Sequence, residues 1–159
     1  MLFLNLEYYS FMDKQKLLLH LHKLTSEKIN QLHIQLIELD EAIAHETKSS
    51  AGDKYETSRE LLNIEKGKYN GQLTVQKNYL KLIHLIKKEK TNLVIDFGAL
   101  IQTEKLYYLM GIPLGKLTFE GEQLFCIGMN APLSQILKRK CKGDYIEFNN
   151  TIIEILSIQ

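Results

Sequence analysis

The sequence predicts an α+β protein in which a long antiparallel coiled-coil hairpin of two helices precedes a small β-rich domain. Apolar residues recur at spacings of three and four over about residues 13–46 and again over about 57–88, which is the period of a helical seam. A polar stretch separates these two runs, and short apolar segments replace the helical period after Lys90. The predicted units are a loosely attached extension over 1–12, the hairpin over 13–90 and the C-terminal domain over 91–159.

The charge balance gives no reason to expect a partner selected by global electrostatics. Lys and Arg total 20 against 19 Asp and Glu, a formal net charge of +1, so any electrostatic function depends on local clusters. No segment approaches the roughly 20 apolar residues of a membrane span, and the first residues lack the basic region and cleavage site of a secretory signal. We expect a cytoplasmic monomer with no membrane partner. Cys126 and Cys141 lack zinc-site spacing and are expected to be reduced, packed thiols.

The first helix is predicted from Asp13 to Glu46, a span without Pro or Gly. Asp13 is a suitable N-cap because its short side chain can accept from the first free backbone N–H groups. At 1.5 Å per residue this helix is on the order of 50 Å long. Its predicted seam consists of Leu18, Leu21, Thr25, Ile29, Leu32, Leu36, Leu39 and Ile43.

The second helix is predicted from Thr57 to Lys88, and its similar length favours an antiparallel return along the first. Gly67 and Gly71 each cost about 1 kcal/mol relative to Ala, so we expect them to loosen the helix or to let its partner approach closely. The alternative is a helical bundle completed by the C-terminal part of the chain. The second predicted seam consists of Leu62, Lys66, Tyr69, Leu73, Gln76, Leu80 and Ile83.

The interruption over residues 47–56 is expected at the far tip of the hairpin, where it carries Asp53 and Glu56. Acidic side chains at the end of a long arm suggest delivery of negative charge into a place that the rest of the protein cannot enter. The alternative is an ordinary polar turn, in which Asp53 caps the second helix and Glu56 lies in its first turn, where negative charge is favoured.

The segment after Lys90 reads as strands, one short helix and a final hairpin. Pro132 is expected to open the helix, and Asn149-Asn150 is expected to form the turn of the hairpin. About 70 residues is small for an independent domain, so we expect it to pack on the base of the helices. The predicted strands are 93–95, 99–101, 105–110, 123–127, 145–148 and 152–156, with the helix over 133–140.

Several short motifs occur in a telling order along the chain. They are Gly52-Asp53-x-x-Glu56 at the tip, Asn130-Ala131-Pro132-Leu133, Gly143-Asp144 and Ile153-Glu154-Ile155. Together they resemble the Gre family of bacterial transcription elongation factors (GreA and GreB), whose tip reads Gly-Asp-x-x-Glu-Asn and whose C-terminal helix begins with Ser-Pro. Thr57 stands where the family has the Asn, and Ala131 stands where it has the Ser, so the chain resembles a divergent member.

This resemblance implies an FKBP-like C-terminal domain that docks at the rim of the RNA polymerase secondary channel, with the coiled coil passing down the channel. The implied docking residues are Asn130, Ala131, Pro132 and Leu133. The implied activity is stimulated cleavage of backtracked RNA, which needs two metal ions and an oriented water. Asp53 would help hold the second Mg²⁺, and Glu56 would hold it or orient the water, since carboxylate oxygens suit Mg²⁺.

By the same resemblance the chain is not an enzyme on its own and binds no cofactor alone, because the catalytic Mg²⁺ belongs to polymerase. Nascent RNA and DNA would be met only indirectly, inside the elongation complex. Two alternatives remain open: a non-cleaving Gre-fold regulator that occupies the channel, and a coiled-coil adaptor unrelated to transcription. The five histidines are not expected to form a metal site, and His20 and His22 point to different faces of their helix.

Overall fold

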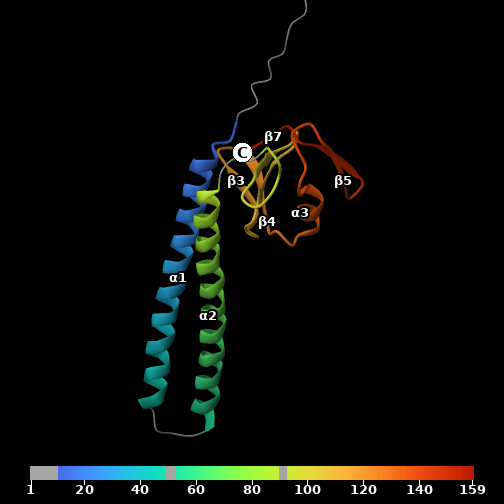
Figure 1. Ribbon diagram of the computed structural model, residues 1–159. Coiled ribbons are helices and arrows are strands. Elements are labelled where there is room, and N and C mark those ends of the chain that lie inside the picture. The colour runs from blue at the N-terminus through green and yellow to red at the C-terminus, as the bar shows by residue number, and fades with distance from the viewer. Residues whose placement is uncertain (1–10, 49–52, 90–92) are drawn as a thin grey trace, which may run out of the picture.

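In the computed structural model, two long helices packed against each other precede a β-rich region. The structure describes residues 11–48, 53–89 and 93–159, without the side chains of 46–48 and 53–55. Helices α1 (Lys14–Lys48) and α2 (Asp53–Lys88) run antiparallel, side by side (Figure 1). Their 35 and 36 residues correspond to about 50 Å each. Helix α1 ends two residues later and α2 begins four residues earlier than predicted, so residues 47–48 and 53–56 of the predicted interruption are helical.

The N-terminus of α1 is capped as predicted. The Oδ1 atom of Asp13 accepts from the backbone N–H groups of Gln15 at 2.9 Å and Lys16 at 3.1 Å, which satisfies two donors that have no partner within the helix. Met12 was assigned to the extension, yet its side chain is only 3% exposed and lies in the core. Residues 1–10 of the predicted extension lie outside the described part.

The predicted seams are the contact between the helices. Most of the first seam is buried, and in its middle Ile29 and Leu32 form a cluster with Leu73 of α2. Lys66, a polar seam position, forms a salt bridge with Asp40 of α1. The described part of the chain contains no further long helix, so the alternative of a helical bundle is wrong.

The two glycines of α2 do not serve a close approach of the arms. An added Cβ at Gly67 or Gly71 would meet nothing within 4 Å, and both positions are exposed. The expectation that they bring the partner helix nearer is therefore wrong for α1.

The β-rich region contains a mixed five-stranded sheet and a separate two-stranded hairpin. The strand order in the sheet is β3-β4-β2-β1-β7, and β2 and β4 pair in parallel while the other neighbours are antiparallel. The strands are β1 (Leu100–Gln102), β2 (Tyr107–Met110), β3 (Gly115–Phe119), β4 (Glu122–Ile127), β5 (Tyr145–Phe148), β6 (Thr151–Glu154) and β7 (Ser157–Ile158).

The hairpin of β5 and β6 was predicted correctly. Asn149 and Asn150 form its two-residue turn with φ of 50° and 60°, the left-handed pair that such a turn needs and that Asn tolerates. Strands β3 and β7 were not predicted. The predicted strand over 93–95 does not form, and Val94 makes only an isolated bridge to Cys141.

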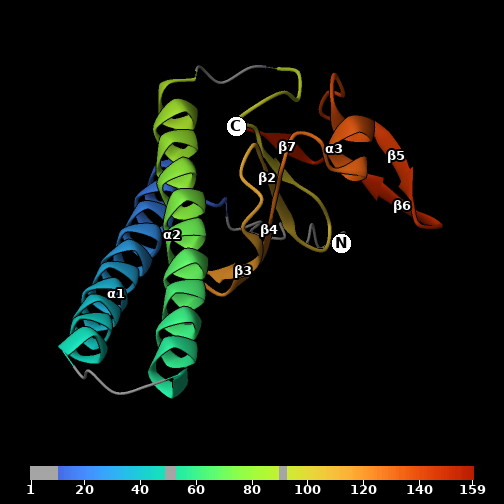
Figure 2. The same ribbon diagram turned by 90° about the horizontal axis from the view of Figure 1, so that it is seen from below.

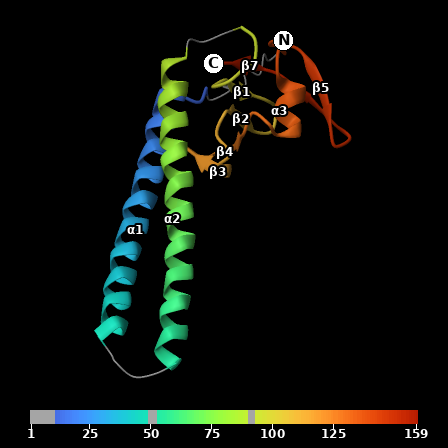
Figure 3. The ribbon, with the colours of Figure 1, turned by 60° about the horizontal axis from the view of Figure 1, so that its bottom comes forward.

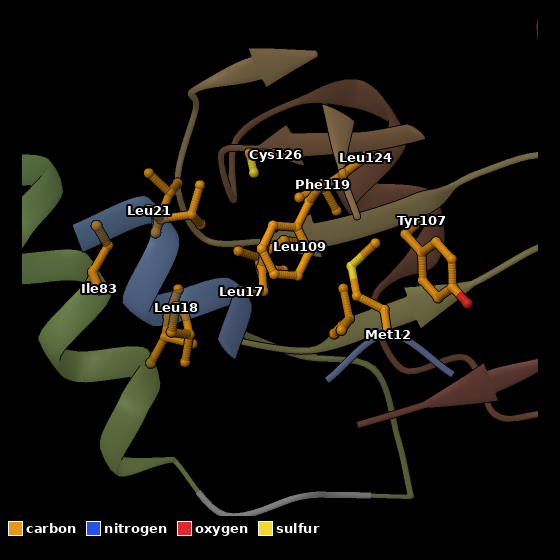
Figure 4. Close-up of a cluster of buried hydrophobic side chains, with 13 residues drawn as sticks. Met12, Leu17, Leu18, Leu21, Ile83, Tyr107, Leu109, Phe119, Leu124 and Cys126 are labelled. Atoms are coloured by element: carbon orange, nitrogen blue, oxygen red, sulfur yellow. The ribbon is translucent and has the colours of Figure 1, made fainter. Parts of the chain in front are cut away.

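The central strands are buried on both faces, and alternate residues enter two different cores. Leu109 and Leu124 pack with α1 and α2 in the first core, whereas Tyr108 and Met110 pack in the second core, with α3 (Pro132–Leu137) and the β5–β6 hairpin. Figure 4 shows the first core, where Leu17, Leu18 and Leu21 of α1 meet the sheet. The sheet thus fixes the base of the helices on one face and supports α3 on the other.

Polar contacts also hold the β-rich region beside the helix base, where it lies in Figures 2 and 3. The Gln159 Nε2 donates to the Met12 carbonyl at 2.7 Å, and Lys14 Nζ donates to the Gln159 carbonyl at 3.1 Å. The Tyr79 hydroxyl donates to the Pro113 carbonyl at 3.3 Å. Within the described ranges, no helix is long and apolar enough to cross a membrane.

The two cysteines differ in their surroundings, although both are free thiols. Cys126 is buried in the core between the sheet and the helices, and burial raises the pKa of its thiol to about 12. Cys141 is exposed, so the expectation of a packed thiol is wrong for this residue.

Candidate functional site at the hairpin tip

The far end of the helices carries the two carboxylates singled out in the sequence. Asp53 is the first residue of α2, and Glu56 follows one helical turn later, at the end of the arm opposite the β-rich region (Figure 1). The Glu56 side chain is exposed, whereas the Asp53 side chain lies outside the described part. In sequence terms the two positions are i and i+3, which are neighbours on a helix surface.

The N-terminus of α2 favours negative charge at these positions. The unpaired N–H groups of the first turn carry partial positive charge, and a carboxylate there is typically stabilising by 0.3–1 kcal/mol when exposed. This physical reason applies equally to a polar turn and to an acidic delivery tip. Glu60, one turn beyond Glu56, is also exposed and extends the acidic side of this helix end.

Two carboxylates supply only part of the ligand set of a metal ion. Carboxylate oxygens are suitable Mg²⁺ ligands, but Mg²⁺ demands near-octahedral coordination. Across the described side chains, no group of three or more His, Cys, Asp or Glu is arranged to hold a metal ion.

The predicted docking segment is only partly available to a partner. Asn130 and Pro132 are exposed, but Leu133 is 7% exposed and packs in the second core. Ala131 occupies the N-cap of α3 and offers no side-chain acceptor. The segment is held by other bonds: Ser134 Oγ donates to the Gly128 carbonyl at 2.8 Å, and Gln135 Nε2 donates to the Met129 carbonyl at 2.7 Å.

A concave site, separate from the tip, lies near the base of the helices and was not predicted. It is a groove of about 280 Å³ between α1 and α2, and His22 and His84 both line it. Spacing within one helix gave no signal for this site, because the two histidines are brought together only by the antiparallel pairing of the arms.

Comparison of the chain with models of protein families, with curated proteins and with solved structures finds no match.

Proposed function

We propose that this chain is a Gre-like factor that binds RNA polymerase through its secondary channel and stimulates cleavage of backtracked RNA. The observation that carries the proposal is the position of Asp53 and Glu56 in the first turn of α2, at the free end of a hairpin with arms of 35 and 36 residues. An arm of about 50 Å is long enough to carry a carboxylate far from the β-rich region.

The rest of the fold supports the same proposal. The alternating seams and the buried Ile29, Leu32 and Leu73 are typical of a coiled coil. In the β-rich region, one short helix packs against one face of a five-stranded sheet, an arrangement compatible with the FKBP-like domain of the family. The first core joins this region to the helix base, so a docked β-rich region would also fix the direction of the arms.

In this proposal the tip residues only position a metal ion and a water molecule. Within the polymerase active centre, a Mg²⁺ ion would supply charge stabilisation and activate a water for attack on the phosphodiester. The exposed Glu56 is suited to accept a hydrogen bond from that water and so to orient it, while Asp53 supplies a second carboxylate one turn away. The catalytic centre belongs to polymerase, so the chain is proposed as a cytoplasmic, monomeric accessory factor.

A second candidate is a non-cleaving regulator that occupies the channel. The specific observation in its favour is Thr57, which directly follows Glu56 at the position where the family carries an Asn. A hydroxyl donates and accepts at one rotatable oxygen, whereas a side-chain amide carries its acceptor and its donors on two separate atoms of a planar group. Docking would then persist while the tip chemistry is lost.

The experiment uses purified RNA polymerase halted in a backtracked complex with end-labelled RNA and Mg²⁺. The proposed factor shortens the RNA, and its Asp53→Asn and Glu56→Gln variants bind polymerase but do not. Glu41→Gln is the matched control, since it removes one exposed carboxylate from the other arm. Binding without cleavage by the unaltered chain would favour the regulator, and absence of polymerase binding would contradict both candidates.

A further inference from the structure

A stripe of apolar residues, separate from the seam that packs on α1, runs along the outer side of α2. Its positions alternate at spacings of three and four, and from Ile64 to Leu85 each lies two residues from a seam position, which is about 200° around the helix. Leu61, Ile64, Val75 and Leu85 are 44–62% exposed. The positions of this outer stripe are Leu61, Ile64, Lys68, Gly71, Val75, Asn78, Leu82 and Leu85.

Within the described residues, the chain itself covers little of the outer stripe. The β-rich region contacts α2 beside the stripe, at Tyr79 and Ile86, and Leu82 packs in part on the first core. Apolar side chains scattered singly are normal at a protein surface and need no explanation. The outer stripe differs because its residues keep coiled-coil spacing over about 36 Å of helix, so the expected occupant is another helix.

The order of residue types in the outer stripe is the same from either end. Each end begins with two large apolar residues followed by a polar one, Lys68 from one end and Asn78 from the other. Gly71 and Val75 lie at the centre, and a Cβ added at Gly71 would meet nothing within 4 Å, so Val75 of a second copy has room there. Two antiparallel copies of α2 would therefore pair Leu61 with Leu85, Ile64 with Leu82, Lys68 with Asn78 and Gly71 with Val75.

Charges beside the outer stripe fit the antiparallel pairing. Glu60 and Lys88 are exposed and flank opposite ends of the stripe on the same side of it. In an antiparallel pair, Glu60 of each copy lies opposite Lys88 of the other copy, which gives two contacts between unlike charges. A parallel pair in register would instead place Lys68 against Lys68 and Glu60 beside Glu65, so like charges oppose that orientation.

We propose that the full chain forms a weak antiparallel dimer in which the outer stripes of two α2 helices pack against each other. Each copy contributes the stripe and a few flanking residues, fewer than the roughly 20–30 residues a side of a standard interface, so the association is weak and reversible. This dimer lies outside the proposed function, in which the monomer acts on RNA polymerase.

Sedimentation equilibrium of the full chain under reducing conditions measures the association. The apparent mass should rise from monomer toward dimer with a dissociation constant on the order of 10–100 μM, as suits a small, transient interface. Val75→Glu should weaken the association at least about tenfold, because it places a carboxylate in the middle of an apolar contact. Ile37→Glu, the same kind of change at a residue of α1 that is 59% exposed, should leave the association unaltered.

Charge reversal tests the contact between Glu60 and Lys88. Glu60→Lys and Lys88→Glu should each weaken the dimer about 3- to 10-fold at low salt, because each places like charges opposite each other at both ends of the contact. The double variant should restore the association, and salt should reduce both effects. Circular dichroism checks that each variant is folded.

Disulfide trapping tests the orientation, in a Cys141→Ser background that leaves only the buried Cys126. Chains with Leu61→Cys and chains with Leu85→Cys should form a mixed disulfide when they are combined and oxidised. Neither chain should cross-link with itself, because the two positions lie about 36 Å apart along the helix and a disulfide spans only a few ångströms.

Three results would overturn the proposal. The first is a monomeric mass at concentrations about tenfold above the expected dissociation constant. The second is a loss of association with Ile37→Glu equal to that with Val75→Glu, since the contact would then not lie on the outer stripe. The third is cross-linking of the Leu61→Cys chain with itself, which would show that the helices pair in parallel.

Discussion

Asp40 of α1 and Lys66 of α2 form a salt bridge across the two arms of the hairpin. Lys66 occupies a seam position where an apolar residue would normally lie, and its partner comes from the facing helix. Both side chains remain partly exposed. The pair therefore contributes little to the stability of the hairpin, and its main effect is to specify which parts of the two arms lie opposite each other.

We predict a small coupling energy for this pair. In a double-mutant cycle with Asp40→Asn and Lys66→Gln, the interaction should amount to about 0–1 kcal/mol, because exposed ion pairs gain little over solvation. Chemical denaturation measures it, and the coupling should shrink at high salt. A coupling well above this range that persists in salt would show that the pair is more desolvated than its exposure indicates.

Two leucines of α1, two positions apart, should respond very differently to the same substitution. Leu17 is 0% exposed and packs in the first core, whereas Leu19 is 61% exposed. Leu17→Ala should reduce the free energy of unfolding by about 2–5 kcal/mol through lost burial and a cavity. Leu19→Ala should change it by no more than about 0.5 kcal/mol. Equal losses in urea denaturation would contradict the packing of the helix base on the sheet.

Replacement of the exposed glycines of α2 should stabilise the chain. Gly67→Ala and Gly71→Ala should each raise the free energy of unfolding by about 1 kcal/mol, because Ala is the better helix former and the added methyl meets no atom within 4 Å. Gly111→Ala is the contrasting variant. Its φ is 120° and a Cβ would lie 2.7 Å from the Phe97 ring, so that variant should be strongly destabilised. Destabilisation by Gly67→Ala would indicate a close partner at that face.

The two thiols should differ in reactivity and in their effect on pH stability. Cys141 is exposed and should react readily with a thiol reagent in the native state, whereas the buried Cys126 should react only after unfolding. The Cys126 pKa is about 12 in the folded chain, against an ordinary value of 9.0. The unfolded chain therefore loses this proton at lower pH, so stability is full below about pH 9 and falls as pH rises from 9 toward 12.

Denaturation of the unaltered chain and of Cys126→Ala across this pH range isolates that contribution. The substitution has its own cavity cost, so the informative quantity is the slope of stability with pH, which should be shallower in Cys126→Ala. Identical slopes, or rapid labelling of Cys126 in the native state, would contradict its placement in the core.

The helical half of the fold could be predicted because its signals are local and periodic. The two seams, which begin at Leu18 on the first helix and end at Ile83 on the second, could be recognised from apolar residues spaced three and four apart. The Asp13 cap depends only on the backbone of the next three residues. At the tip, α1 nevertheless ends two residues later and α2 begins four residues earlier than predicted, since the apolar period fades there while the backbone of 47–48 and 53–56 is helical.

The sheet was predicted less well because its strands depend on distant partners. In strand β3 the exposed Lys116 and Thr118 alternate with less exposed positions, but the run is short and begins with Gly. Its pairing with β4 defines it as a strand. Strand β7 has two residues and forms only by pairing with β1. Conversely, 93–95 has a strong apolar run, but its backbone bonds only to the irregular segment over 139–141 within the described residues.

Sequence separation explains why the tip carboxylates could be found from the sequence whereas the groove between the helices could not. Asp53 and Glu56 lie three residues apart on one helix, so their proximity is encoded locally. His22 and His84 are 62 positions apart and line one groove only because α1 and α2 pack antiparallel.

The most direct test of the central claim is the rate of RNA cleavage in a backtracked complex with the unaltered chain and with Glu56→Gln, each at saturating concentration. The rate should fall about 10- to 100-fold with Glu56→Gln, as for loss of a group that orients a metal-bound ligand, and should be unchanged with Glu41→Gln. Equal polymerase binding by all three proteins assigns the loss to the tip. Undiminished cleavage by Glu56→Gln would contradict the account.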